Sequence, residues 1–276
     1  MVKDIRVLIL DGAVHPEFYN PTDHWSRHLG SVSYSSVRLP LGEPAPTLES
    51  FSHVIVTGSE DRITKPRQWH EVEARIVRRA VEMGKVVLGS CFGHQMLARE
   101  LMQGRHAVSS NTPEMGWFPI ERLDIAGSGF QNRSLNTAVM GEEDEEGGFE
   151  RVGQGFSEGG DVLEGGDALL KGLPDPFYIF CSHFDEVIDV EEPWRVLARS
   201  ARCGVQVMRL EDKPVWGIQA HPEITPSDAR LLLEGMLKTN PTHAGLIEPA
   251  LGMVVRDDEV IDTLVKNFLK IDPIEI

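Results

Sequence analysis

The chain has 276 residues, of which 41% are hydrophobic, enough for one large domain with a buried core. It carries 27 Lys and Arg against 43 Asp and Glu, a formal net charge of −16. This acidic balance argues against nucleic acid or an anionic membrane as a partner. The amino terminus shows neither a signal-peptide pattern nor a long apolar run, and the three cysteines form no C-x-x-C pair. We therefore expect a cytoplasmic protein without a disulfide framework.

Alternating strand and helix patterns run through the first hundred residues. Residues 5–10, 52–58 and 85–90 are short runs rich in Val, Ile and Leu that end at turn residues, as buried parallel strands do. Residues 69–84 carry apolar side chains at helical spacing and end at a glycine. In such β-α-β units the ligand lies beyond the carboxyl ends of the strands. The pattern predicts an α/β fold with an open, mostly parallel sheet flanked by helices.

The second half of the chain divides into three parts. Residues 141–167 are dense in Gly and acidic residues and are expected to form a solvated insertion. Four strand-like runs then precede a predicted helix at residues 227–238. The segment 241–276 is expected to be a helical extension packed on the core, with a dimer or partner surface as the alternative. Residues 1–240 would then form one domain that contains the insertion.

Cys91 lies in the sequence Gly89-Ser90-Cys91-Phe92-Gly93, between a predicted strand and a predicted helix. Glycines two positions on either side of a nucleophile allow the tight turn of a nucleophile elbow. The N–H groups at the start of the helix favour the thiolate form of a cysteine placed there. The alternative is an ordinary buried thiol at a strand end. The pentapeptide alone leaves both interpretations open.

A nucleophile of this type needs a base and a group that orients the base. His221 and Glu223 follow a strand-like run in "GIQAHPEIT" and are two residues apart, so both side chains can lie on one side of an extended segment. His221 could accept the thiol proton while Glu223 fixes the tautomer of the imidazole ring. The conjunction of this pair with the elbow favours the catalytic interpretation of Cys91.

Together, "VLGSCFGHQMLARELMQG" and "GIQAHPEIT" resemble the class I, or triad, glutamine amidotransferase family. The segments "VIVTGSED", "EMGWFPIE" and "CSHFDEV" are similar to further family segments in the same order. The resemblance implies a flavodoxin-like class I amidotransferase fold with the elbow at a strand end. It also implies that Cys91 attacks the side-chain carbonyl carbon of glutamine to form a γ-glutamyl thioester. His221 would then protonate the departing ammonia and activate water, assisted by Glu223.

The same resemblance implies the remaining site residues. The backbone N–H groups of Phe92 and of the Gly58-Ser59 turn, with Ser59 as the main candidate, would form the oxyanion hole. Gln95 would contact the amino-acid end of the substrate, and Ser182 and His183 would lie in a substrate loop whose backbone does likewise. No cofactor and no metal is expected, because the family chemistry needs none.

Three positions depart from the family pattern: Ser90 before the cysteine, Glu60 in the oxyanion loop, and Ala220 before the histidine. Ala220 could enlarge the space beside His221, which would admit substrates larger than glutamine. A separate feature, the pair His24 and His28, has a spacing that could in principle bind a metal, although an ordinary first loop and helix is the expected structure.

The expected activity is hydrolysis of the glutamine side-chain amide to glutamate and ammonia. A synthetase that accepts the ammonia is a possible partner, and a homo-oligomer is possible. The alternatives are a hydrolase of γ-glutamyl amides or peptides that uses the same chemistry, and a non-catalytic regulatory relative. Substrate turnover separates them, because a dedicated subunit needs its partner, a γ-glutamyl hydrolase prefers substituted amides, and a regulator forms no thioester.

Overall fold

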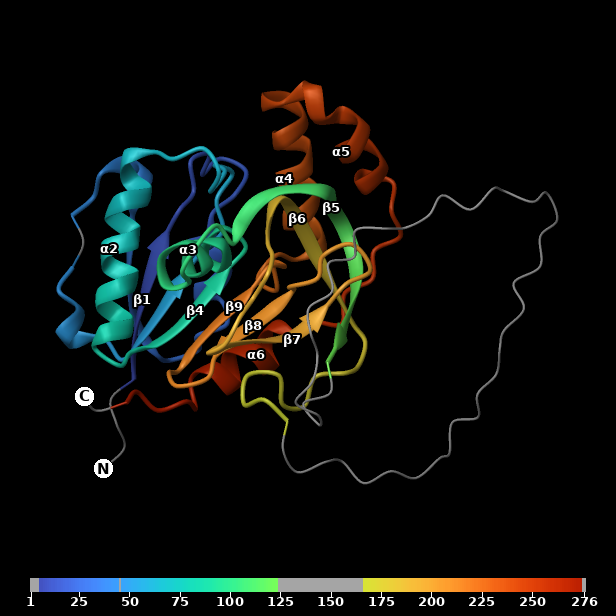
Figure 1. Cartoon of the computed structure of the whole chain (residues 1–276). Coiled ribbons are helices and arrows are strands. Elements are labelled where there is room, and N and C mark those ends of the chain that lie inside the picture. The colour runs from blue at the N-terminus through green and yellow to red at the C-terminus, as the bar shows by residue number, and fades with distance from the viewer. Residues whose placement is uncertain (1–4, 45, 124–165, 275–276) are drawn as a thin grey trace, which may run out of the picture.

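The computed structural model describes residues 5–44, 46–123 and 166–274. The expected acidic insertion at 141–167 lies outside the described residues, apart from its last two positions. Within these residues the strands form one sheet in the order β2-β1-β3-β4-β9-β8-β7-β5-β6 (Figure 1). Among the described helices, none combines the length and the apolar composition needed to span a membrane.

The sheet has a parallel half and an antiparallel half. The parallel strands are β1 (Arg6–Asp11), β2 (Ser33–Arg38), β3 (His53–Val56), β4 (Val86–Ser90) and β9 (Val215–Ile218). Antiparallel pairing adds β8 (Val207–Leu210), β7 (Trp194–Arg199), β5 (Ala107–Arg122) and β6 (Phe177–Val187). The predicted α/β class is thus confirmed, with a sheet that is mixed rather than mostly parallel.

Helices cover both faces of the parallel half. They are α2 (Gln68–Glu82) and α3 (Phe92–Leu101) on one face and α1 (Pro21–Ser26) and α6 (Ile261–Phe268) on the other. The helices α4 (Pro226–Thr239) and α5 (Ala244–Leu251) pack on the antiparallel strands instead, and short 3-10 turns lie at Leu39–Leu41, Leu48–Ser50 and Pro241–His243. Alternation along β1 assigns the faces, since successive side chains point to opposite sides of a strand. Leu8 and Leu10 belong to the cluster that contains the buried residues of α2 and α3, whereas Val7 and Ile9 pack with α1 and α6.

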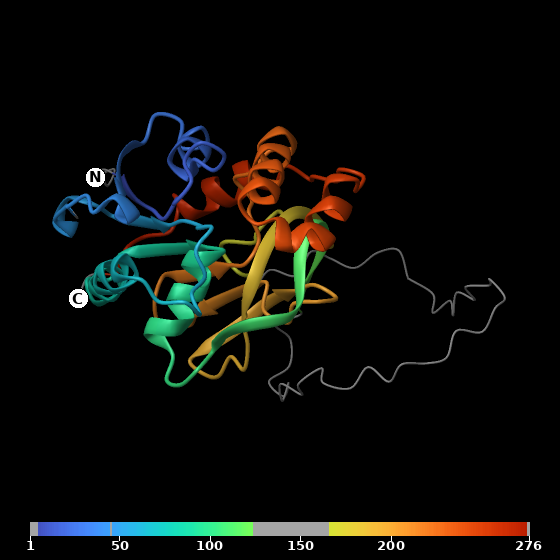
Figure 2. The same cartoon turned by 90° about the horizontal axis from the view of Figure 1, so that it is seen from above.

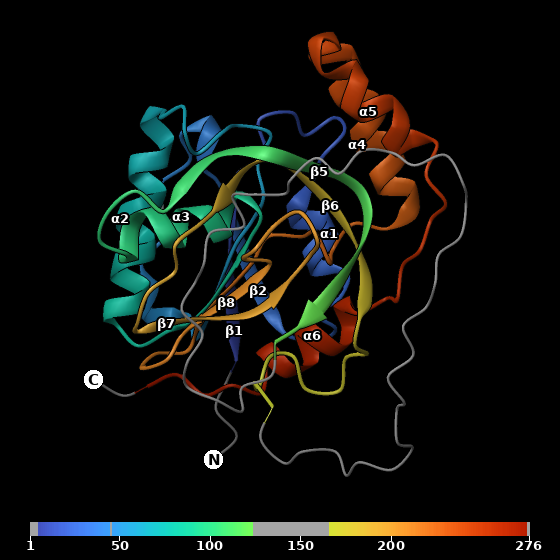
Figure 3. The same ribbon diagram turned by 45° about the vertical axis from the view of Figure 1, so that its right-hand side comes forward.

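The long strands β5 and β6 form the far edge of the sheet and curl away from the parallel half (Figure 3). Beside them lies a third apolar cluster, built from α4, α5 and the loop after β1 and including Phe18, Trp117 and Leu233. Seen from above, α4 and α5 lie next to one end of this strand pair (Figure 2). This cluster packs α4 and α5 against β5 and β6.

Two helices follow residue 240. α5 packs on β5, where Gly116 lets Met253 approach the backbone because a Cβ at residue 116 would lie 2.4 Å from the sulfur of Met253. α6 buries Leu264, Val265 and Phe268 in the cluster beneath the sheet. The division into a domain that ends at residue 240 and a C-terminal extension stays a prediction.

Candidate active site

Cys91 stands between the end of β4 and the start of α3. Its backbone has φ 49° and ψ −103°, a positive φ that is uncommon outside glycine. The N–H of Cys91 donates to the carbonyl of Ile218 at 2.8 Å, and its carbonyl accepts from the N–H of Gln95 at 3.1 Å. The turn is therefore fixed on both sides, by β9 and by the first turn of α3, and has the strand-turn-helix form of a nucleophile elbow.

The two flanking glycines are required by close packing rather than by positive φ. A Cβ on Gly89 would lie 2.6 Å from the backbone carbonyl group of Gly93, and a Cβ on Gly93 would lie 2.1 Å from the carbonyl oxygen of Val56. Both contacts are with backbone atoms, which cannot move aside as a flexible side chain can. The glycines let α3 approach β3 and β4 closely, which places the helix amino terminus beneath Cys91.

His221 and Glu223 lie in the turn after β9, next to the elbow. Nδ1 of His221 is 2.8 Å from Oε1 of Glu223, and both residues are almost fully buried. Burial alone lowers the pKa of His221, but the negative charges of Cys91 and Glu223 and hydrogen bonds to both outweigh it and raise the pKa to about 10. Burial works to raise the pKa of Glu223, yet the charge and hydrogen bond of His221 hold it below its usual value. The arrangement favours a protonated His221 ring that is held by the ionised Glu223 and faces the sulfur of Cys91.

Two further residues, neither of them predicted from the sequence, contact Glu223. The hydroxyl of Tyr19 donates to Oε1 at 3.0 Å, and its ring meets the His221 ring edge-on at a centroid distance of 5.7 Å. The hydroxyl of Ser90 lies 3.4 Å from Oε2 and 3.2 Å from the carbonyl oxygen of Ala220. Ser90, a departure from the family pattern, thus places a polar group beside the carboxylate.

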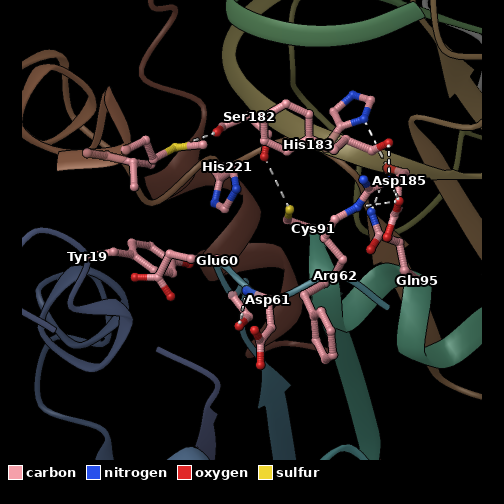
Figure 4. A pocket seen from close by; sticks show the side chains of 15 residues that line it. Tyr19, Glu60, Asp61, Arg62, Cys91, Gln95, Ser182, His183, Asp185 and His221 are labelled. Carbon is pink, nitrogen blue, oxygen red and sulfur yellow. Dashed lines mark hydrogen bonds and ion pairs between the residues drawn. The ribbon is translucent and has the colours of Figure 1, made fainter. Parts of the chain in front are cut away.

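A pocket opens over the sulfur of Cys91 (Figure 4). Its lining comes from the loop after β1, the loop after β3, the elbow, β6, the turn after β9, and α4. Figure 4 shows His221 beside Cys91, with Tyr19 and Glu60 on one side and Arg62, Gln95 and Asp185 on the other. Leu232 and Met236 of α4 add an apolar wall. The carboxyl end of the parallel sheet, where the sequence predicts ligand binding, is therefore the end that carries this pocket.

The loop after β3 is tied to both sides of the pocket. Oε2 of Glu60 accepts from the N–H of Val14 at 2.9 Å, and Oε1 accepts from the N–H of His15 at 3.2 Å. Arg62 donates from Nε to Oδ1 of Asp185 on β6 at 2.9 Å. Glu60, which departs from the family pattern, therefore links this loop to the loop that carries Tyr19.

The predicted oxyanion residues lie beside Cys91 but differ in what they face. Phe92 and Ser59 line the pocket. Gly58 lies against His221 and Tyr19 instead, since a Cβ there would fall 2.6 Å from Cε1 of His221 and from the hydroxyl of Tyr19. The structure thus places Ser59 and Phe92 in the same pocket lining as Cys91 and leaves no room for a side chain at residue 58.

The three predicted substrate residues border the pocket, although their side chains are engaged elsewhere. Nε2 of Gln95 donates to the carbonyl oxygen of Asp185 at 2.7 Å. Ser182 presents its carbonyl oxygen 3.6 Å from the sulfur of Cys91. The ring of His183 is turned into the protein interior, where Nε2 lies 3.0 Å from Glu114. The segment expected as a substrate loop is part of the regular strand β6, because it pairs with β5 along this stretch.

Glu114, His183 and Cys203 form a buried group whose donor atoms lie within 4.8 Å of one another. The carboxylate of Glu114 also accepts from Oγ of Ser200 at 2.6 Å and from Nε2 of Gln206 at 2.5 Å. Burial raises the pKa of Cys203 well above its usual value, which disfavours the thiolate that a metal would need. The network therefore fits a structural role that holds β6 beneath the pocket.

The histidines of the first helix do not converge on one point. Nε2 of His24 lies 3.7 Å from Asp228, whereas Nδ1 of His28 lies 2.7 Å from Asp262. Ala220 is buried in the cluster on the far face of the sheet and does not line the pocket. The space expected beside His221 is instead occupied by Tyr19, so Ala220 gives no support for a larger substrate.

The family model for class-I glutamine amidotransferases matches residues 20–238. The chain belongs to this family. One of the subunits of a glutamine-hydrolyzing GMP synthase from Methanopyrus kandleri is 28% identical over 183 residues, which cover 66% of this chain and 72% of that protein. A glutamine-hydrolyzing GMP synthase from Aeropyrum pernix is 29% identical over 198 residues, or 72% of this chain, but the match covers only 29% of that longer protein.

The fold is similar to that of a solved glutamine amidotransferase. The crystal structure of a glutamine amidotransferase from Thermotoga maritima superposes with a TM-score of 0.67, covering 97% of each chain at 17% identity. This likeness confirms the class I amidotransferase fold implied by the sequence motifs. It also shows that the antiparallel strands and the helices after residue 240 belong to an arrangement that a solved amidotransferase shares along almost its whole length.

Proposed function

We propose that this amidotransferase hydrolyses the side-chain amide of glutamine through a thioester on Cys91, with His221 and Glu223 as base and orienting group. The observation that carries the proposal is the convergence of these three residues, of which Cys91 and His221 line the pocket and Glu223 lies behind His221. Cys91 occupies the elbow, His221 lies beside it, and Glu223 holds Nδ1 of the imidazole at 2.8 Å. Family membership supports glutamine as the substrate.

In the first half of the reaction, the sulfur of Cys91 forms a bond to the side-chain carbonyl carbon of glutamine. The carbonyl π electrons move to oxygen, and the resulting tetrahedral intermediate collapses by breaking the C–N bond. His221, protonated as its raised pKa of about 10 favours, donates its proton to the leaving nitrogen, so that ammonia departs and a γ-glutamyl thioester remains.

In the second half, neutral His221 accepts a proton from water as the water oxygen attacks the thioester. The C–S bond breaks, glutamate leaves, and the Cys91 thiolate again faces an imidazolium. Glu223 remains ionised throughout and stabilises that cation, consistent with its lowered pKa.

The developing oxyanion is assigned to the backbone N–H groups of Phe92 and Ser59, with Gly58 keeping the turn close to His221. The first N–H groups of a helix have no partner within it, and Phe92 is the first residue of α3. Removing one such donor typically costs about 3 kcal/mol of transition-state stabilisation.

The amino-acid end of the substrate is assigned to the wall formed by Gln95, Ser182 and His183. The ring of His183 is bonded to Glu114, so this residue would act through its backbone. Gln95 would contribute its side-chain oxygen Oε1, since its Nε2 already donates to the backbone carbonyl of Asp185.

We further propose that the ammonia is delivered to a partner synthetase. The Methanopyrus kandleri relative is named as one of the subunits of a glutamine-hydrolyzing synthase, and its match covers most of both chains. The hydrolase of larger γ-glutamyl amides is not favoured, because Ala220 lies away from the pocket. Cytoplasmic location and self-association stay predictions.

The test measures glutamate release from glutamine and from a panel of γ-glutamyl amides, with Cys91→Ala as the inactive control. We expect Cys91-dependent turnover of glutamine that is slow alone and faster with the cognate synthetase. Preference for a substituted amide would overturn the substrate assignment. Fast glutamine turnover by the protein alone, with no change when any synthetase from the same genome is added, would overturn the proposal of a synthetase partner.

A further inference from the structure

The carboxylate of Glu223 is bonded on both of its oxygens. Oε1 accepts from His221 and from the Tyr19 hydroxyl at 3.0 Å, while the Ser90 hydroxyl approaches Oε2 at 3.4 Å. Tyr19 is 2% exposed and Glu223 is 1% exposed, so water cannot replace a lost partner without rearrangement. When a buried carboxylate loses one of its hydrogen-bond donors, the folded state becomes less stable and the carboxylate is no longer held in one orientation.

Tyr19 is itself held in two ways. Its ring packs edge-on against the imidazole of His221 and belongs to the apolar cluster that includes Phe18 and Leu232. The chain just before it is fixed by Glu60, whose carboxylate accepts from two consecutive backbone N–H groups, those of Val14 and His15. The hydroxyl therefore reaches Glu223 from a loop that Glu60, in the loop after β3, helps to fix.

We propose that Tyr19 is a positioning residue for the His221–Glu223 pair. Its hydroxyl holds Oε1 of Glu223, the oxygen that His221 also contacts, so that the imidazole points at Cys91. The proposal rests on the proposed glutamine hydrolysis but concerns a residue outside the triad. Tyr19 acts through Glu223 and not on the reacting atoms. Its contribution should therefore depend on the presence of the Glu223 carboxylate.

The groups that act electrostatically on this contact come from several elements. Cys91, His221 and Glu60 surround it from the elbow, the turn after β9 and the loop after β3. His24 of α1 lies nearby with Asp228 and Arg27, and burial lowers its pKa. A donor that bonds the ionised carboxyl lowers its pKa, so loss of the Tyr19 hydroxyl raises the pKa of Glu223.

The test compares Tyr19→Phe with Tyr34→Phe, which removes a hydroxyl from a 45% exposed tyrosine on the edge strand β2. We expect Tyr19→Phe to lower kcat for glutamine by about tenfold with little change in KM, as loss of a hydrogen bond to a charged group implies. The acid limb of the pH profile should move to higher pH. Tyr34→Phe should change neither.

A double-mutant cycle separates positioning from general packing. Tyr19→Phe is measured again in a Glu223→Ala background, where no carboxylate remains to be held. We expect its tenfold effect to shrink to less than about twofold there. An equal loss in both backgrounds, or an unshifted acid limb in the single variant, would overturn the proposal.

A second readout works without glutamine turnover. Alkylation of Cys91 by iodoacetamide, followed on the Cys91 peptide by mass spectrometry, reports the thiolate in wild type and in each variant. The same cycle on the alkylation rate should show the same dependence on Glu223. If the wild-type protein alkylates with this pattern but releases no glutamate from glutamine, the proposed function fails while the role of Tyr19 stands.

Discussion

Arg62 bonds Asp185 at one side of the pocket, joining the loop after β3 to strand β6. Nε of Arg62 donates to Oδ1 at 2.9 Å, and Thr64 donates from its hydroxyl to Oδ2 at 2.9 Å. The Asp185 side chain is 2% exposed, whereas that of Arg62 is 25% exposed. The pair therefore closes one wall of the pocket with a carboxylate that water cannot reach.

Removing Arg62 should leave this buried carboxylate without its cation. We expect Arg62→Met to lower the free energy of unfolding by about 1–3 kcal/mol, below the range for fully buried pairs because Arg62 is partly exposed. Arg79→Met is the matched control, since Arg79 forms an exposed pair with Glu82 and should cost less than about 0.5 kcal/mol. Urea unfolding of both variants measures the difference, and equal costs would contradict it.

Gly93 tests the packing of the elbow helix. A methyl group there would lie 2.1 Å from the backbone oxygen of Val56, so Gly93→Ala should destabilise the protein by about 3 kcal/mol or more. Gly245→Ala, at an exposed position of α5 with open space around it, should be neutral or stabilising by up to about 1 kcal/mol. Thermal unfolding of the two alanine variants decides, and a stable Gly93→Ala protein would contradict the close approach of α3.

The charge on Cys91 is the largest influence that raises the pKa of His221. In Cys91→Ala that attraction and its hydrogen bond are lost, while Glu223 remains. We expect the pKa of His221 to fall from about 10, because the largest of the interactions that favour the protonated ring is removed. NMR titration of the imidazole in wild type and in Cys91→Ala measures the change. An unchanged titration would show that Cys91 and His221 do not form an ion pair.

The sequence was sufficient to predict the elbow and the histidine-glutamate pair, because each lies within a few consecutive residues. Tyr19 was missed because its contact with Glu223 joins residues 204 positions apart. A signal did exist, since the loop after β1 begins at the same end of the parallel sheet as the elbow. Only packing, however, determines which of its side chains reaches the carboxylate.

The antiparallel half of the sheet was also missed, although the length of the connection between two strands carries information about their direction. β8 ends at Leu210 and β9 begins at Val215, and four intervening residues are too few for the crossover that parallel neighbours require. Strand-like composition shows that such segments pair but not in which direction. The inward turn of the His183 ring could not be inferred either, because Glu114 approaches it from another strand.

Glu73 on α2 makes stability depend on pH. Its side chain is fully buried, neither carboxylate oxygen has a hydrogen-bond partner among the described residues, and burial raises its pKa to about 8. The folded state thus binds a proton that the unfolded state releases near pH 4.5, so stability falls as the pH rises from about 4.5 to about 8.

Replacing Glu73 by Gln removes this titration. We expect Glu73→Gln to be more stable than wild type at pH 9 and to lose that advantage at pH 5, where Glu73 is protonated in the folded protein. Melting temperatures of both proteins across this range measure the effect. A stability difference that does not vary with pH would contradict a buried carboxyl that titrates near 8.

In the proposed mechanism Cys91 forms a γ-glutamyl thioester with glutamine. Acid quenching of wild type, His221→Ala and Cys91→Ala after brief mixing with glutamine, followed by mass spectrometry of the intact protein and of its Cys91 peptide, tests it directly. We predict an adduct of one γ-glutamyl group on Cys91 in the wild type, reduced in His221→Ala and absent in Cys91→Ala. Glutamate release without an adduct on Cys91, or release that persists in Cys91→Ala, would contradict the mechanism.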